Sequence, residues 1–344
     1  MKFNNIVIES FAYSLSDEIM SSDRIEKRLA PIYKKLKLPE GRLELMTGII
    51  ARRVWPLGTK PSDLSTQAAE KLFLKSKIKK EDVDLLIHAS VCRDFLEPAT
   101  ASVVHANLGL SRKAMIFDLS NACLGVINAI VVAGNMIENG QIKSALIVSG
   151  ENGGPLLENT ISELLNNPKI DRKNIKKYIA NLTIGSAATA LLITHKNLSP
   201  DSPRILGGAV ETDSSANHLC RGDGNTHSLV METDSEELLK YGVNLAKSTW
   251  QGLLHELGWS NDTPDLVLTH QVGTAHEKLS LESLELTHKK TYKTYPFLGN
   301  TGSSALPITL MMAAEDPNVL KKGDSIALLG IGSGLSSIML GVQW

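Results

Sequence analysis

The chain repeats one order of strands and helices, and this repeat constrains its fold more than any other sequence feature. Asp84-Leu-Leu-Ile-His-Ala-Ser-Val resembles Asp265-Leu-Val-Leu-Thr-His-Gln-Val, 181 residues later. Ser144-Ala-Leu-Ile-Val-Ser-Gly resembles Ile326-Ala-Leu-Leu-Gly-Ile-Gly, 182 residues later. Two pairs at nearly one interval favour an ancient duplication. Chance similarity is the alternative, because apolar strands use few residue types.

Each half alternates helices with short apolar strands. Strands are predicted over residues 85–89, 114–118, 145–149, 188–193, 266–270 and 326–331, and helices over residues 68–77, 125–137 and 245–257. Near-continuous apolar strands are typical of a sheet that crossover helices cover on both faces. We therefore expect an α/β fold of two similar halves, residues 1–195 and 196–344. The polar helical segment at about 152–181 is interpreted as an insertion on the first half.

Composition excludes several classes of protein. The 344 residues carry a net charge of −1 and are 42% hydrophobic, so no basic surface for nucleic acid is expected. We recognise no signal peptide and no apolar run of membrane-spanning length. The three cysteines lack disulfide-framework or zinc spacing. These features predict a cytoplasmic protein without a metal site.

Cys123 is the candidate nucleophile. It lies in Asp118-Leu-Ser-Asn-Ala-Cys-Leu-Gly, between a predicted strand and the predicted helix at 125–137. The start of a helix offers unpaired N–H groups and partial positive charge, which favour the reactive thiolate over the thiol. This position predicts covalent catalysis through an acylated cysteine.

Three further motifs could complete a site around Cys123. His270 ends a predicted strand, where α/β sheets gather active-site groups, although a buried structural histidine is the alternative. Asn300, in Gly-Asn-Thr-Gly, is either a turn residue or a donor to a developing oxyanion or enolate. Gly330-Ile-Gly-Ser-Gly is either a tight turn or a close backbone approach, in which the N–H of Ser333 joins that of Cys123 around a thioester oxygen.

These four motifs, in this order, resemble those of the thiolase-superfamily condensing enzymes, and the nearest branch is ketoacyl synthase III. The resemblance covers essentially the whole chain. It implies a five-layer αβαβα fold of two similar halves and a homodimer. It also implies Cys123, His270 and Asn300 as the catalytic residues, acyl thioesters of coenzyme A as substrates, and no cofactor.

Glu97 distinguishes this chain within that branch. It precedes Pro98 in Ser90-Val-Cys-Arg-Asp-Phe-Leu-Glu-Pro-Ala, where the fatty-acid-initiating synthases usually carry an apolar residue. This Glu-Pro, together with Leu-Cys-Arg-Gly at residues 219–222, resembles the OleA-type acyl-CoA-condensing enzymes of bacterial olefin biosynthesis. The resemblance implies that Glu97 reaches the active site of the partner subunit. A structural charge beside Pro98 is the alternative.

Three positions depart from the initiating synthases. Met46 and Ala275 stand where arginines are expected, and Arg42 replaces a tryptophan. Those residues help to hold coenzyme A in the initiating enzymes, so the phosphate contacts of this chain are left open. The candidates, each with surface charge as the alternative, are Arg52, Arg53 and Arg221.

Acyl condensation requires an acyl group on a leaving group and a carbon nucleophile. A thioester on Cys123 supplies the first. A malonyl donor forms the nucleophile by losing carbon dioxide, whereas a plain acyl-CoA must lose an α-proton to a base. A carboxylate in a dry pocket, such as Glu97, is a suitable base. We predict a non-decarboxylative Claisen condensation of two fatty acyl-CoAs to a 2-alkyl-3-oxoalkanoate.

Other functions share most of these residues. One is a decarboxylating 3-oxoacyl-[acyl-carrier-protein] synthase III, and another is an acyl-CoA thioesterase, since Cys, His and Asn also serve hydrolysis. A non-catalytic subunit is disfavoured by the retained catalytic residues. Downstream pathway enzymes are possible partners. The polar stretch at residues 212–233, with His218 and His227, predicts a surface or channel-covering loop.

Overall fold

The computed structural model describes residues 1–223 and 230–344, and in these residues the main sheet has ten strands. The N-terminal half of the sheet holds β1 (Ile6–Ser14), β4 (Leu85–Ala89), β5 (Met115–Leu119), β6 (Ser144–Glu151) and β7 (Ala187–His195). The C-terminal half holds β8 (Arg204–Thr212), β11 (Leu266–Thr269), β12 (Lys290–Thr291), β13 (Ser325–Gly332) and β14 (Ser336–Gln343). The order of the strands in the sheet is β12-β11-β13-β14-β8-β1-β7-β6-β4-β5.

The two halves of the sheet have the same pairing pattern. In the first, β4 pairs in parallel with β5 and β6, while β7 runs antiparallel to β6 and β1. In the second, β11 pairs in parallel with β12 and β13, while β14 runs antiparallel to β13 and β8. The repeated sequences lie on β4 and β11 and on β6 and β13, so the prediction of two similar halves is confirmed. The boundary between residues 195 and 196 stays a prediction; it falls between β7 and β8.

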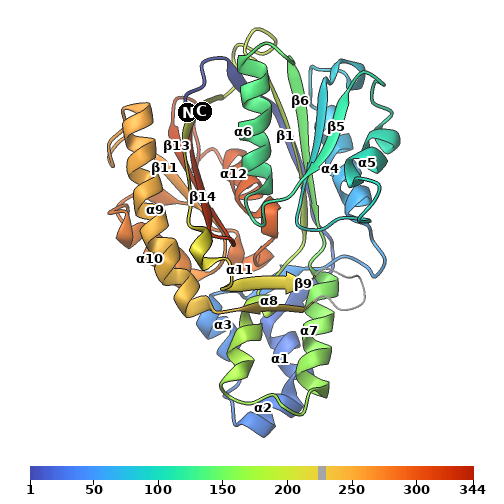
Figure 1. Cartoon of the computed structure of the whole chain (residues 1–344), viewed down its shortest axis with the longest axis vertical. Helices are drawn as coiled ribbons and strands as arrows, with labels where there is room; N and C mark the ends of the chain where they lie inside the picture. The colour runs from blue at the N-terminus through green and yellow to red at the C-terminus, as the bar shows by residue number, and fades with distance from the viewer. Residues whose placement is uncertain (224–229) are drawn as a thin grey trace.

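The two halves of the sheet and three layers of helices together form the five layers expected from the sequence. The central helices α6 (Gly125–Glu138) and α12 (Ala305–Glu315) share one apolar core with strands of both halves. Outer helices α4 (Pro61–Phe73) and α5 (Thr100–Leu108) pack on the first half, and α9 (Ser235–Leu257) packs on the second beside α10 (Thr274–Ser283). Figure 1 shows the two outer layers on opposite sides of α6 and α12.

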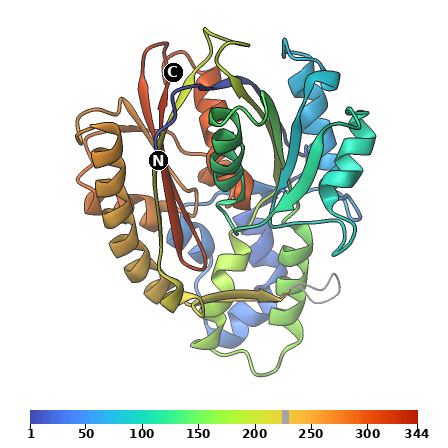
Figure 2. The same ribbon diagram turned by 45° about the horizontal axis from the view of Figure 1, so that its top comes forward.

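A helical cap lies at one end of these layers (Figure 2). It consists of α1 (Ser22–Arg28), α2 (Ala30–Leu36), α3 (Arg42–Thr47), α7 (Gly154–Asn166), the 3-10 helix η2 (Asn174–Tyr178) and α8 (Ile179–Leu182). Its separate apolar core includes Ile25, Leu43, Leu157 and Ile161. The predicted insertion at 152–181 therefore supplies only part of the cap, because residues 22–47 supply the rest.

Short elements connect the cap to the sheet. The small sheets are β2 (Ile19–Ser21) with β3 (Ala51–Arg53) and β9 (Cys220–Asp223) with β10 (Val230–Thr233). The remaining short helices are η1 (Lys80–Asp82), η3 (Ser214–Ala216), α11 (Tyr295–Leu298) and η4 (Gly302–Ser304). The loop expected at 212–233 thus contains two paired strands, because β9 and β10 satisfy each other's backbone groups; His227 lies outside the described residues.

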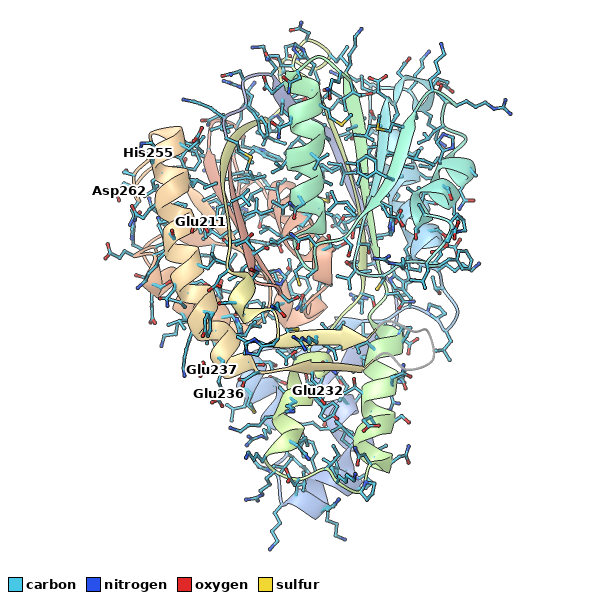
Figure 3. The ribbon with its side chains drawn as sticks, in the orientation of Figure 1. Glu211, Glu232, Glu236, Glu237, His255 and Asp262 are labelled. Carbon is cyan, nitrogen blue, oxygen red and sulfur yellow. The ribbon has the colours of Figure 1, made fainter. Side chains whose placement is uncertain are left out.

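Two ion pairs join the cap to the β10–α9 segment. Lys177 contacts Glu232 at 3.0 Å, and Lys176 contacts Glu236 at 3.1 Å. Figure 3 labels both glutamates where this segment approaches the cap. All four side chains are exposed, so neither pair contributes much to stability. In the described parts of the chain, no helix combines the length and apolar character needed to span a membrane.

Candidate active site

Cys123 lies in a tight turn between β5 and α6. Ala122 has φ of +46°, a left-handed conformation that costs energy for a residue with a side chain. The Leu124 N–H donates to the Asn121 carbonyl at 2.9 Å, and α6 begins at the following residue. The turn therefore places the thiol at the N-terminal end of a central helix.

The protonation of Cys123 differs from expectation. Burial, with smaller effects of the Glu151 carboxylate and the Cys220 thiol, raises the pKa of the Cys123 thiol to about 12. The helix N-terminus acts in the opposite sense, but desolvation of the charged form outweighs it. The expected thiolate is therefore wrong for the free chain. Cys123 must lose its proton when substrate arrives.

His270 directly follows β11. Its backbone N–H donates to the Leu329 carbonyl of β13 at 3.0 Å, and its side chain is buried. Burial, with a smaller effect of His276, lowers the pKa of His270 to about 4. The imidazole is therefore neutral at physiological pH and able to accept the proton of a thiol.

Asn300 is held on three sides. Its N–H donates to the Thr183 carbonyl at 2.9 Å, and its carbonyl accepts from the Gly185 N–H at 2.9 Å. Its side-chain Oδ1 accepts from the Gly302 N–H at 3.1 Å. This contact leaves the Nδ2 amide as the donating end, which is the group that stabilises a developing negative charge.

Gly332, the last residue of β13, lies against the Cys123 turn. A Cβ at this position would be 3.1 Å from Leu124 Cγ and 3.6 Å from the Asn121 carbonyl oxygen. The missing side chain allows the end of β13 to approach the turn closely. Ser333 follows next, so its backbone N–H remains our proposed partner of the Cys123 N–H.

Glu151 is a site residue that no sequence motif identified. It ends β6, is buried, and accepts hydrogen bonds from the N–H groups of Val91, Cys92 and Ser303 at 2.9, 3.2 and 3.0 Å. Burial raises the pKa of this carboxyl, and the N–H donors oppose that shift. The sequence feature that could have indicated Glu151 is its place as a charged residue at the end of an otherwise apolar strand.

Glu97 does not join the buried residues of its own chain. It is exposed on the loop of residues 90–99, between β4 and α5, and a cis peptide bond links it to Pro98. Phe95 and Leu96 beside it are 45% and 87% exposed. His270 is hydrogen-bonded to β13, whose end lies against the Cys123 turn. Ser303, three residues after Asn300, accepts from the Val126 N–H of α6 at 2.8 Å. Glu97 lies on the surface of its own chain.

The candidate phosphate contacts have different environments. Arg52 is fully buried and donates to the Met20 carbonyl and Ser22 Oγ, so it is excluded as a phosphate contact. Arg53 donates to the Ser16 carbonyl at 3.1 Å. Arg221 is exposed on β9.

A pocket, open to solvent, lies in the helical cap. Its polar lining is supplied by Arg42, Arg172 and Lys176, and Met46 is among its apolar residues. Two positions that depart from the initiating synthases, Arg42 and Met46, therefore line a single pocket.

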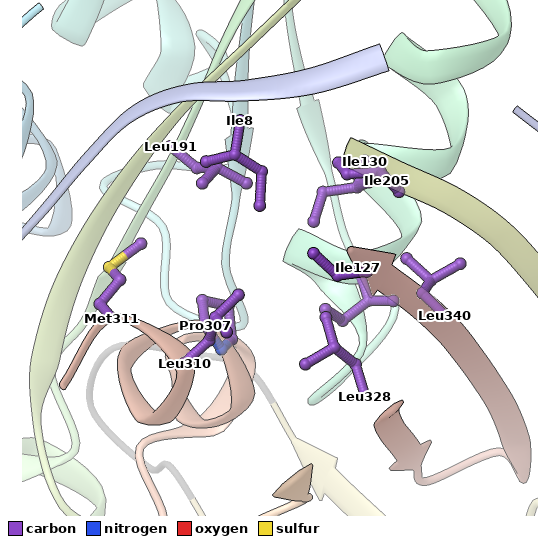
Figure 4. Close-up of a pocket in the computed structure, with 11 residues that line it drawn as sticks. Ile8, Ile127, Ile130, Leu191, Ile205, Pro307, Leu310, Met311, Leu328 and Leu340 are labelled. Atoms are coloured by element: carbon purple, nitrogen blue, oxygen red, sulfur yellow. The ribbon is translucent and has the colours of Figure 1, made fainter. Parts of the chain in front are cut away.

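A small apolar pocket lies between the central helices α6 and α12 (Figure 4). It is lined by Ile8, Ile127, Ile130, Leu191, Ile205, Pro307, Leu310, Met311, Leu328, Leu340 and Val342. The lining includes none of the candidate catalytic residues, so this pocket belongs to the core. Among residues 1–223 and 230–344, no three His, Cys, Asp or Glu side chains are grouped to hold a metal ion.

Known proteins match the chain along its length. Residues 46–192 match the thiolase N-terminal domain, and residues 254–344 match the C-terminal domain of 3-oxoacyl-[acyl-carrier-protein (ACP)] synthase III. The chain is 39% identical to the acyl-CoA:acyl-CoA alkyltransferase of Shewanella oneidensis, with both sequences covered completely. The chain belongs to the acyl-CoA:acyl-CoA alkyltransferase family.

Solved structures agree with this assignment. A crystal structure of a Cys-to-Ala variant of Xanthomonas campestris OleA is 38% identical, with a TM-score of 0.95 over 100% of this chain and 98% of that chain. A Cys-to-Ser variant of the same protein, with bound lauric acid and lauroyl-CoA, gives a TM-score of 0.94 at 38% identity over 99% and 100% of the two chains. The resemblance and the thiolase fold are confirmed, and the protein is an acyltransferase of the thiolase superfamily.

Proposed function

We propose that this member of the alkyltransferase family joins two fatty acyl-CoAs by a non-decarboxylative Claisen condensation and releases a 2-alkyl-3-oxoalkanoate. The observation that carries the proposal is the arrangement of a half-buried thiol, a neutral imidazole and a donating amide on contacting segments. The Shewanella oneidensis relative is an acyl-CoA:acyl-CoA alkyltransferase, which supports this reaction.

The first step acylates Cys123. The neutral His270 takes the thiol proton, the sulfur attacks the thioester carbonyl of one acyl-CoA, and the backbone N–H groups of Cys123 and Ser333 hold the oxyanion. The bond to coenzyme A then breaks, and the departing thiolate takes a proton. Burial raises the pKa of the Cys123 thiol. We therefore expect Cys123 to lose its proton as the sulfur attacks the carbonyl, and not beforehand.

The second step forms the carbon–carbon bond. Glu97 of the partner copy takes an α-proton from the second acyl-CoA, and His270 and Asn300 Nδ2 stabilise the enolate oxygen. The α-carbon attacks the acyl-Cys123 carbonyl, the carbon–sulfur bond to Cys123 breaks, and the thiolate recovers a proton. Water then cleaves the 2-alkyl-3-oxoacyl thioester to the free acid and coenzyme A.

A homodimer is part of this proposal. Strand β5 is an edge of the main sheet, and its residue Met115 is 51% exposed. The exposed Phe95 and Leu96 lie on the Glu97 loop. An open edge strand and exposed apolar side chains favour burial against a second copy. In such a dimer, Glu97 enters the partner's active site.

Coenzyme A has a candidate site in the cap. We assign its phosphates to Arg42, Arg172 and Lys176, because these three cations line one pocket that also has apolar walls. Arg221, exposed on β9, is retained as a further candidate contact.

Glu97 variants test the reaction most specifically. The parent, Glu97→Asp and Glu97→Gln are each given one acyl-CoA, and mass spectrometry follows acyl-Cys123 and condensed product. We expect Glu97→Gln to be acylated but to make no condensed product, with partial activity in Glu97→Asp. Condensation by Glu97→Gln at the parental rate would contradict the proposed base. A need for malonyl-carrier protein would identify the decarboxylating synthase instead.

A further inference from the structure

The Glu151 carboxylate joins two segments that the proposed reaction uses separately. Val91 and Cys92, which donate to it, belong to the loop that carries Glu97. Ser303, its third donor, lies in η4, directly after the Asn300 turn. One buried carboxylate therefore contacts both the loop of the proposed base and the turn of the enolate-stabilising amide.

The same contacts extend to the nucleophile. Ser303 Oγ accepts from the Val126 N–H in the first turn of α6 at 2.8 Å and donates to the Ala89 carbonyl at 2.8 Å. Gly302 has no side chain and so leaves room for the carboxylate. A Cβ at this position would lie only 3.0 Å from Glu151 Oε1. The start of the Cys123 helix is thus linked to Glu151 through one serine.

The three donors require an acceptor on both carboxylate oxygens. Oε1 accepts from Val91 and Ser303, and Oε2 accepts from Cys92. In a glutamine, Oε1 could still accept from the Val91 and Ser303 N–H groups. Its Nε2 would take the place of Oε2 and, being a donor itself, could not accept from the Cys92 N–H. A buried donor without an acceptor is unfavourable, so the chemistry of the position favours a carboxylate.

We propose that Glu151 is a positioning residue, which holds the Glu97 loop and the Asn300 turn in the geometry needed for condensation. It acts through its hydrogen bonds and does not touch the reacting atoms. The inference rests on the proposed function. It adds that Glu151 links the Asn300 turn, which serves the active site of its own chain, to the Glu97 loop, which serves the active site of the partner.

The test uses Glu151→Gln and Glu151→Asp, with Glu138→Gln as the matched control. Glu138, near the far end of α6, also accepts two backbone N–H groups and one side-chain amide. We expect Glu151→Gln to slow condensation by about 10-fold to 100-fold, the effect of losing the part-buried hydrogen bond from the Cys92 N–H. Glu138→Gln is expected to condense at the parental rate.

A second readout separates positioning from general damage. The Glu151 carboxylate contributes to the raised pKa of Cys123, so Glu151→Gln should increase alkylation of Cys123 by iodoacetamide at a fixed pH, measured on the Cys123 peptide by mass spectrometry. Glu151→Asp keeps the charge, so its alkylation profile should match the parent's while its condensation falls. If Glu151→Gln does not fold, slower condensation by the folded Glu151→Asp still supports the proposal, and parental condensation overturns it.

The outcomes also separate this inference from the reaction itself. A parent that condenses, with Glu151→Gln equally fast and equally alkylated, overturns the role of Glu151 alone. An equal loss in Glu138→Gln also overturns it, because the effect is then not local. A parent that makes no condensed product overturns the proposed function, and the role of Glu151 with it.

Discussion

The Cys123 thiol and the His270 imidazole both favour their neutral forms because desolvation disfavours the charged form of each group. For Cys123, we predict that alkylation of the free enzyme by iodoacetamide rises tenfold per pH unit from pH 7 to pH 10 without a plateau. The reason is that the pKa of the thiol is about 12. An unstructured peptide with a single cysteine is the control, and its alkylation should level off above its ordinary pKa of about 8.5. A plateau for Cys123 near pH 8 would show an activated thiolate instead.

His270 makes stability depend on pH in a definite direction. Its pKa is about 4 in the folded chain, and an unperturbed histidine has a pKa of about 6.5. The neutral form therefore stabilises the fold above pH 6.5, and this contribution is lost as the pH falls toward 4, because the unfolded chain binds the proton first.

Comparison with His270→Gln isolates this effect. Between pH 7.5 and pH 5, the parent should lose about 2 kcal/mol more unfolding free energy than the variant. Chemical denaturation at one protein concentration measures the difference. Identical pH dependence of the two proteins would mean that His270 is not buried in its neutral form.

At the scale of elements, the reaction depends on the approach of β13 to the turn before α6. In Gly332→Ala the new Cβ would lie 3.1 Å from Leu124, which should displace the Cys123 turn and slow acylation about tenfold. The matched control is Gly252→Ala on α9, whose Cβ would lie 3.1 Å from Ala209. Stopped-flow release of coenzyme A measures acylation. Equal slowing in both variants would contradict a local role of Gly332.

Local sequence patterns predicted most elements but not all their limits. The strands expected at 85–89 and 326–331 lie on β4 and β13, because continuous apolar runs determine buried strands directly. The helix expected at 245–257 is only the end of α9, which starts at Ser235. Its first turns carry charged residues that lack apolar periodicity, and the capping Asp234 gives the start.

The residues of the site that lie in recognisable local motifs could be predicted from the sequence. Cys123, His270 and Asn300 follow strands or open turns, so their placement depends on nearby sequence. Glu151 and the cap depend on long-range contacts: Glu151 binds Ser303, 152 residues away. The protonated state of Cys123 likewise depends on burial, which no local motif determines.

At the scale of the whole molecule, we predict that two copies pair through the Glu97 loop. Leu96→Asp should convert the dimer to a monomer, because it places a charge on an 87% exposed apolar side chain of that loop. The control is Leu74→Asp, at a position that is also 87% exposed. Light scattering gives the mass. The monomer should still form acyl-Cys123 but lose condensation; an unchanged dimer in Leu96→Asp would contradict this interface.

The most direct test of the central claim is product analysis by mass spectrometry. The purified protein is mixed with a single long-chain acyl-CoA, with no malonyl donor present. The account predicts a 2-alkyl-3-oxo acid, or the ketone that remains after it loses carbon dioxide. Free fatty acid as the sole product would contradict acyl–acyl condensation.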